Sequence, residues 1–156
     1  MSKFSDLINN ELLFWSLFSC VFAQVLKIIF NLIIKKEFKF SVMFETGGMP
    51  SSHSALISSL TVGLGLELGF DSPIFALAVG ISLIVMYDAS GIRQSAGLQA
   101  IEINKISEKI NDHKETYLKE TLGHTKLEVF VGSCLGVFTT IIGMEFINPF
   151  NQIFIF

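Results

Sequence analysis

The sequence predicts an all-α integral membrane protein, with a four-helix transmembrane core and an amphipathic interfacial helix between the third and fourth spans. Hydrophobic residues make up 51% of the 156 residues, and the mean hydropathy is +0.59. The hydrophobic residues gather in blocks that are longer than the helices of an ordinary soluble domain. Most of the Lys and Arg residues fall between the blocks. We therefore expect a single membrane domain over residues 1–156.

The first two blocks are predicted to cross the bilayer as helices. The first covers residues 12–34, which make roughly 34 Å of helix and are enough to span a hydrocarbon core. The second covers residues 53–70. It contains Gly65 and Gly69, whose small-xxx-small spacing lets helix backbones approach closely in lipid.

The third and fourth blocks complete the predicted core. The third covers residues 73–87 and opens at a proline, a residue suited to the first turn of a helix, although it is short for a span. The fourth covers residues 129–147, and Gly132 and Gly136 repeat the small-xxx-small spacing. The aromatic tail that follows, residues 150–156, is expected at the lipid boundary.

Residues 92–110 predict the amphipathic helix. Apolar residues recur there at helical spacing among polar ones: Ile92, Ala96, Ile103, Ile106 and Ile110. The pattern leaves open whether this helix lies in the cytoplasmic interface or packs on the bundle.

The distribution of basic residues predicts the orientation. If all four blocks cross, one side of the membrane holds nine of the eleven Lys and Arg residues. These are Lys35, Lys36, Lys39, Arg93, Lys105, Lys109, Lys114, Lys119 and Lys126. The positive-inside rule makes this side cytoplasmic and places both termini outside. The expected location is a bacterial-type plasma membrane.

Charge and composition exclude two classes of protein. A net charge of -3 and a pI near 5.6 provide no basic surface for nucleic acid, and no Cys/His cluster indicates a metal site. Cys20 and Cys134 lie inside apolar blocks and are expected to be packing residues. His113 lies in a charged run and is expected to be a solvated surface residue. The oligomeric state stays open, because the glycine pairs could serve contacts within one chain or between chains.

Three polar stretches carry the chemistry, and the predicted topology places them at one membrane face. The first is GGMPSSHS, residues 47–54. Its glycines free the backbone, its proline can open a helix, and the N–H groups of the following turn would point at an incoming anion. This stretch is therefore suited to holding a phosphate next to His53, with Gly48 as a candidate site residue.

The second and third stretches supply a cation and a second histidine. In YDASGIR, Arg93 could make a bidentate contact to phosphate oxygens, whereas Asp88 is equally a helix cap, a partner of Arg93 or a site residue. In GHTKLE, His124 and Glu128 are four residues apart and would share one helix face. The carboxylate could then hold one ring nitrogen while the other faces a substrate.

Lys27 is a cation inside the first span. Burying it costs about 2.5 to 3.5 kcal/mol on insertion scales. Gln24 lies on the same helix face, so we expect both residues to serve the site. The alternative is that Lys27 snorkels toward the interface, roughly 10 Å away.

The motifs resemble those of a phosphatase superfamily. PSSH at residues 50–53 and the pair His124 and Glu128 resemble the phosphate-site motifs of the type 2 phosphatidic acid phosphatase (PAP2) superfamily. GGMPSSHSA, YDASGIR, AGLQA and LGHTKLEV resemble its divergent branch, which is related to the acid phosphatases and vanadium-dependent haloperoxidases. The resemblance covers about residues 24–136.

This resemblance implies a role for each motif residue. His124 would be the nucleophile that takes the phosphoryl group, with Glu128 standing where the family usually has Asp. His53 would protonate the leaving alcohol. The phosphate would be bound by Lys27, Ser51, Ser52 and Arg93. A phosphohistidine intermediate needs no metal, so we expect no cofactor.

The sequence departs from the superfamily pattern in three places. No Arg-Pro pair follows Lys27, and Ser52 stands where a glycine is usual. Arg93 lies 31 residues before His124, where the pattern has only a few residues between them. An inserted amphipathic excursion would explain this gap.

The predicted function is hydrolysis of a lipid phosphate, with phosphatidate, phosphatidylglycerol phosphate or an isoprenyl diphosphate as candidate substrates. Two alternatives stay open. The same cluster could bind a lipid phosphate in order to move or sense it without cleavage, which the missing Arg-Pro pair favours. The chain could also be a structural membrane protein that keeps a degenerate site.

Overall fold

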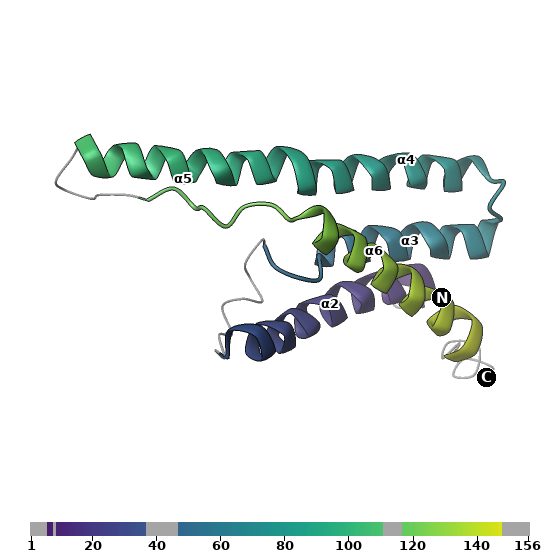
Figure 1. Ribbon diagram of the computed structural model, residues 1–156. Helices are drawn as coiled ribbons and strands as arrows, with labels where there is room; N and C mark the ends of the chain where they lie inside the picture. The colour runs from purple at the N-terminus through teal and green to yellow at the C-terminus, as the bar shows by residue number, and fades with distance from the viewer. Residues whose placement is uncertain (1–5, 8, 37–46, 111–116, 148–156) are drawn as a thin grey trace.

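Helices account for all the regular structure in the described part of the chain, as the ribbon of this computed structural model shows (Figure 1). That part comprises residues 6–7, 9–36, 47–110 and 117–147. The predicted all-α class is confirmed. The aromatic tail 150–156, Lys39, His113 and Lys114 lie outside the described residues.

Helix α2 (Glu11–Lys35) is the first long apolar helix. The side chain of Asn10 caps its start by accepting a hydrogen bond from the N–H of Leu13 at 2.9 Å. Its large apolar side chains point outward, as lipid requires: Leu17, Val21, Ile29 and Ile33 are all exposed. Apart from Trp15, its buried positions are small or polar: Ser16, Ser19, Ala23 and Lys27. The small residues let neighbouring helices approach closely.

Helix α3 (Ser52–Leu68) is the centre of the bundle and contacts α2, α4 (Pro73–Tyr87) and α6 (Lys126–Ile141). Gly132 and Gly136 of α6 meet it so closely that a Cβ at either position would overlap the backbone of Ser51 or Ala55. The predicted close packing at this glycine pair is therefore confirmed, and it occurs within one chain.

The other glycine pair behaves differently. Gly65 faces the rings of Phe70 and Phe75, whereas Gly69 has a φ of 90° and ends α3. The prediction that Gly69 serves helix packing is wrong, because its left-handed backbone is needed where the helix stops.

Pairs of hydroxyl groups join the helices inside the bundle. The pairs are Ser19 with Thr139 at 2.5 Å, Ser59 with Thr140 at 2.5 Å and Thr61 with Ser82 at 2.6 Å. Lipid provides no hydrophobic force between helices, so close packing and such hydrogen bonds hold them together.

Three helical stretches are long and apolar enough to span a membrane: Glu11–Ile33, Pro73–Ile110 and Lys126–Phe146. The last of them continues α6 into a π-helical end, η3 (Ile142–Ile147). The chain is an integral membrane protein, as predicted. Helix α3 has 17 residues and is not among these three stretches, so its crossing of the bilayer stays a prediction.

The amphipathic segment is not a separate element. Helix α5 (Arg93–Ile110) continues α4 through a π-helical turn, η2 (Asp88–Ile92), and the three make one helix of 38 residues. Such a helix is about 57 Å long against a hydrocarbon core of about 30 Å, so part of it must lie outside the core. Figure 1 shows α5 extending past the other helices. An interfacial position for this segment stays a prediction.

From residue 117 the chain returns beside α5 without regular structure and reaches the start of α6 (Figure 1). This return brings the stretch around His124 next to η2. The long connection therefore begins and ends at the same place in the fold.

Candidate functional site

The three polar stretches meet at one end of the bundle. The N–H of His124 donates to the carbonyl of Ala89 at 2.9 Å, which joins the third stretch to the second. The N–H of Ser51 donates to the carbonyl of Glu128 at 3.1 Å, which joins the first to the third. These two main-chain bonds place side chains from distant parts of the sequence around one point.

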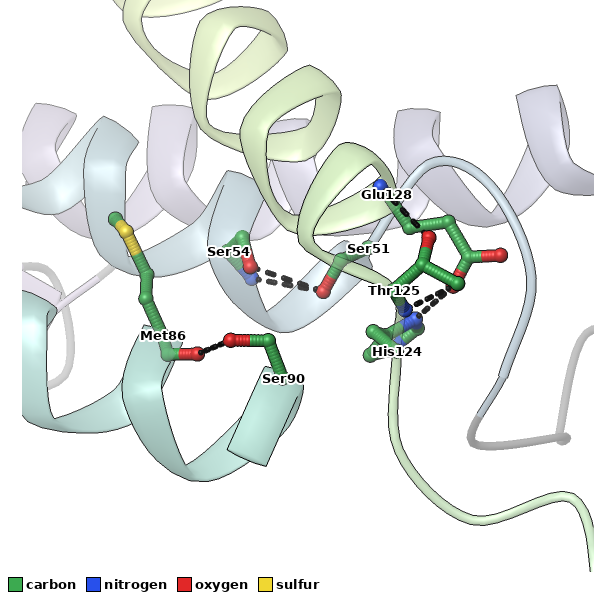
Figure 2. A network of polar contacts seen from close by, with 7 residues as sticks. All are labelled: Ser51, Ser54, Met86, Ser90, His124, Thr125 and Glu128. Carbon is green, nitrogen blue, oxygen red and sulfur yellow. Dashed lines mark hydrogen bonds and ion pairs between the residues drawn. The ribbon is translucent and has the colours of Figure 1, made fainter. Parts of the chain in front are cut away.

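The start of α3 presents hydrogen-bond donors at this point. Ser51 is the N-cap residue, and its Oγ accepts from the N–H of Ser54 at 3.4 Å and from the hydroxyl of Ser54 at 3.0 Å (Figure 2). Because Ser51 Oγ is the acceptor in both of these bonds, its own hydroxyl group can still donate a hydrogen bond. The first N–H groups of a helix also lack partners within the helix, and the helix dipole there favours an anion. Pro50 precedes the cap and does not open the helix itself.

Lys27 lies beneath the loop that leads into α3. Its side chain is only 2% exposed, and a Cβ at Gly48 would lie 3.5 Å from its Cγ and Cδ. Gly48 has a φ of 94°, which a residue with a side chain rarely adopts. The lysine side chain is therefore buried in protein rather than exposed to lipid, and it lies against the first polar stretch.

His124 and Glu128 are paired, although not as two residues on one helix face. Thr125 is the N-cap of α6, so His124 precedes the helix. The carboxylate of Glu128 reaches back and accepts from the N–H of Thr125 at 3.1 Å, while the N–H of Glu128 donates to Thr125 Oγ1 at 3.3 Å. The same carboxylate oxygen lies 3.1 Å from His124 Nδ1 (Figure 2). The predicted contact is present, and its physical cause is a capping box rather than helical periodicity.

This pairing determines the state of the imidazole. A carboxylate at Nδ1 holds the proton there and leaves Nε2 with a free lone pair. Burial lowers the pKa of His124 most strongly; the hydrogen bond and charge of Glu128 oppose that effect, and Lys27 and His53 add to it. With its pKa below the ordinary value of 6.5, His124 is mainly neutral at pH 7.

The predicted site residues form a buried floor and an exposed rim. We define the floor as Lys27, Ser51, Ser52 and His124, each of which is at most 4% exposed. We define the rim as His53 and Arg93, which are both exposed. The charges of Arg93 and Lys27 act on His53, so rim and floor lie within electrostatic range of each other.

Arg93 does not reach onto the floor. Its Nε donates to Asp88 Oδ2 at 2.6 Å across the π-helical turn, and half of its side chain is exposed. Of the three roles that the sequence left open for Asp88, the one observed in the structure is that of ion-pair partner of Arg93.

Two side chains of α2 lie near the floor in sequence, and one of them contacts it. Cys20 is hydrogen-bonded to Ser52. Gln24, one turn further along α2, has a buried Oε1 without a hydrogen-bond partner in the described part of the chain. The sequence analysis missed Cys20. It lies seven residues before Lys27 and four before Gln24, and this helical spacing would have found it.

The described residues contain no group of three or more His, Cys, Asp or Glu side chains that could hold a metal ion. The polar groups gathered at this end of the bundle are instead hydroxyls, main-chain N–H groups, two imidazoles and two cations. Such donors are suited to an anion with several oxygens.

Comparisons with known proteins identify the family to which this chain belongs. Residues 8–139 match the family described as the divergent PAP2 family. A protein of Bacillus subtilis (strain 168), named uncharacterized membrane protein YuiD, is 38% identical over 151 residues, which cover 88% of this chain and 96% of the relative. No solved structure matches the chain. The chain belongs to the divergent PAP2 family, as its motifs predict.

Proposed function

We propose that this protein is a membrane-embedded phosphatase that hydrolyses a lipid phosphate through a phosphohistidine at His124. The candidate substrates are phosphatidate, phosphatidylglycerol phosphate and an isoprenyl diphosphate. The observation that carries the proposal is the contact of 3.1 Å between His124 Nδ1 and Glu128, because it leaves a neutral imidazole with Nε2 free to attack phosphorus. Membership of a PAP2-related family supports the same class of reaction.

In the first step, Nε2 of His124 attacks the phosphorus atom, and the bond from phosphorus to the lipid oxygen breaks. His53 gives its proton to the departing oxygen, which leaves as an alcohol or, from a diphosphate, as a monophosphate. The imidazole gains positive charge as it takes the phosphoryl group. The carboxylate of Glu128, already at Nδ1, stabilises that charge.

In the second step, a water molecule attacks the phosphohistidine, and the bond between phosphorus and Nε2 breaks. His53, which is now neutral, accepts a proton from this water. Inorganic phosphate leaves, and His124 returns as a neutral imidazole with its proton on Nδ1. Both histidines are then in their starting states.

The floor supplies the groups that hold the phosphoryl oxygens. The hydroxyl of Ser51 and the N–H groups at the start of α3 would donate to them, and the buried ammonium of Lys27 would balance their charge. Ser52 is positioned by Cys20, and Gln24 lies beside Lys27 on α2. Arg93 would join the phosphate from the rim after leaving Asp88.

We also propose that the site opens to the cytoplasm. The ends of α2 and α5 that carry Lys35, Lys36, Lys105 and Lys109 lie at the same end of the bundle as the site. Because Lys and Arg are retained on the cytoplasmic side, this end is expected to face inward. Lipids made on the inner leaflet would then reach the site.

One observation favours binding or transport of a lipid phosphate without cleavage. Arg93 is turned away from the floor and is held by Asp88 at 2.6 Å, and the family's Arg-Pro pair is missing. A site with one cation on its floor provides less stabilisation to a transition state than one with three.

The test is phosphate release by the purified protein in detergent containing EDTA, measured against the three candidate lipids. The wild type is compared with H124A and with the matched control H113A, which removes the histidine predicted to be solvated. We expect release and an acid-labile phosphoryl label for both the wild type and H113A, and neither release nor label for H124A. Release that survives in H124A would exclude the proposal.

If no candidate lipid yields phosphate, lipid binding decides between the remaining alternatives. Binding of these lipids that is lost in a Lys27→Met variant would support the binding or transport function. A structural protein with a degenerate site would bind none of them.

A further inference from the structure

Asn104 is a buried polar residue that the proposed reaction does not use. It is 5% exposed, although all the other residues from 102 to 110 on α5 are exposed. A buried amide must have its hydrogen bonds satisfied, or it costs stability. We therefore asked what Asn104 holds.

Its amide binds the returning chain at three points. Oδ1 accepts from the N–H of Leu118 at 3.0 Å, and Nδ2 donates to the carbonyl of Leu118 at 2.9 Å and to Glu120 Oε1 at 2.8 Å. Both main-chain groups of one residue are thus engaged, as a neighbouring strand would engage them. The bonds to the main chain hold the returning chain at Leu118, and the bond to the side chain of Glu120 distinguishes this register on α5 from its neighbours.

Two glycines hold the same segment closer to the bundle. A Cβ at Gly97 would lie 2.8 Å from the carbonyl oxygens of Glu120 and Leu122. Gly123 has a φ of 83°, and a Cβ there would overlap the backbone of Gln94. The main chain therefore lies directly on α5 at both places.

The spacing along the two chains agrees. From Gln94 to Asn104 the helix rises about 15 Å, at 1.5 Å for each residue. From Leu118 to Gly123 an extended chain covers about 16 Å, at about 3.3 Å for each residue. The segment is thus matched in length to the helix surface on which it lies.

We propose that Asn104 is a positioning residue for His124, acting through the register of residues 117–123. His124 follows this segment directly, and its N–H is bonded to Ala89 at 2.9 Å. A slip of one residue would move the histidine by about 3.3 Å and break its contact with Glu128, which is only 3.1 Å long. The residues between Arg93 and His124 then have a structural role, because α5 and the returning chain together fix the position of the nucleophile. This inference rests on the proposed function for its catalytic consequence but not for its geometry.

The geometry is tested without any activity. The chain has three histidines, so the ¹⁵N spectrum of the histidine-labelled protein in detergent can be assigned with single substitutions at His53 and His113. We expect N104A to shift or broaden the Nδ1 signal of His124, because its bond to Glu128 is lost. The matched control Q99A, which removes an exposed amide from the same helix, should leave that signal unchanged. An unchanged signal in N104A would overturn the inference.

The catalytic consequence is tested by steady-state kinetics and by an exchange of partners. We expect N104A to lower kcat roughly 100-fold and to leave KM within about twofold, because Lys27, Ser51 and Ser52, which would bind the phosphate, are untouched. N104D should be at least as impaired, because its carboxylate would face Glu120. Adding E120Q turns that repulsion into a hydrogen bond but leaves the carboxylate facing the carbonyl of Leu118, so it should recover part of the kcat that N104D loses. A kcat that N104A does not lower, or a double variant no better than N104D, would contradict the positioning role.

The two proposals can fail separately. If the wild type releases no phosphate while the His124 signal still depends on Asn104, the proposed phosphatase function is wrong and the positioning role of Asn104 stands. If the wild type is active and N104A retains its kcat and its His124 signal, the positioning role is wrong and the phosphatase stands.

Discussion

The floor and the rim of the site differ in how they are held. Every floor residue is buried and is fixed by a helix start, a main-chain bond or a neighbouring loop: Ser51 caps α3, and His124 is bonded to Ala89 and Glu128. The rim residues are exposed, and Arg93 is held in an ion pair with Asp88. In the proposed reaction, the floor is thus arranged before the substrate binds, whereas Arg93 must first leave Asp88.

This difference separates two contributions to catalysis. Groups that are already in position lower the barrier of the chemical step, because they need no reorganisation during the reaction. A group that must first break an interaction with another residue contributes chiefly to substrate binding. Its net contribution is smaller by the free energy of the interaction that it gives up. Substitutions on the floor should therefore lower kcat, and substitution of Arg93 on the rim should raise KM. His53 lies on the rim but transfers the proton in the proposed reaction, so its substitution should lower kcat as well.

The largest expected effect comes from removing the carboxylate behind the nucleophile. Glu128→Gln keeps the size of the side chain but can present an amide N–H to His124 Nδ1, which favours the wrong tautomer. We expect kcat to fall roughly 10²- to 10⁴-fold with little change in KM. The measurement is steady-state phosphate release. An increase in KM without a fall in kcat would mean that Glu128 acts in substrate binding and not in the chemical step.

A matched control separates the capping role of Glu128 from its catalytic role. Thr125→Val removes the other half of the capping box and leaves the carboxylate beside His124. It should cost about 1 kcal/mol of stability in unfolding measurements. Its kcat should stay within a few-fold of the wild type, and a loss as large as that of Glu128→Gln would mean that helix capping alone explains both results.

A smaller effect is expected on the rim. Arg93→Ala should raise KM by about tenfold and leave kcat nearly unchanged, because an exposed cation contributes to substrate binding across water. Asp88→Asn weakens the ion pair that holds Arg93 at 2.6 Å, so it should lower KM modestly. A higher KM in Arg93→Ala together with a lower KM in Asp88→Asn would support a role for Arg93 in substrate binding. A large fall in kcat in Arg93→Ala would show that Arg93 moves onto the floor during the reaction.

Local sequence signals predicted much of this arrangement. The helices begin and end close to the predicted limits, for example at Glu11 and Lys35 against 12 and 34 for the first block. The contact between His124 and Glu128 was also expected. Its cause was misassigned, because a Thr followed three residues later by Glu marks a helix start and so places His124 before the helix.

Long-range features were not readable from one sequence. The π-helical turn at Asp88–Ile92 joins the third apolar block to the amphipathic segment, and no residue there forbids the tighter ladder of an α-helix. Similarly, the amide of Asn104 and the backbone of Leu118 are 14 residues apart, and no periodicity connects a helix to an irregular chain. Such contacts depend on how the whole chain is packed.

The smallest effect concerns the pH dependence of the floor. Because the folded protein lowers the pKa of His124, the neutral nucleophile persists below pH 6.5, and the acid limb of the activity profile that belongs to it should lie on the acid side of that value. Stability follows the same sign: the unfolded histidine takes up a proton first, so the contribution of His124 is complete above pH 6.5 and declines as the pH falls toward its lowered folded pKa. Glu128 raises this pKa and Lys27 lowers it, so Glu128→Gln should move the limb to lower pH and Lys27→Met should move it to higher pH. Both shifts can be measured by ¹⁵N titration of His124 even where activity is weak. An unchanged pKa of His124 in both variants would mean that burial alone sets it, and that the charges of Glu128 and Lys27 do not act on the imidazole.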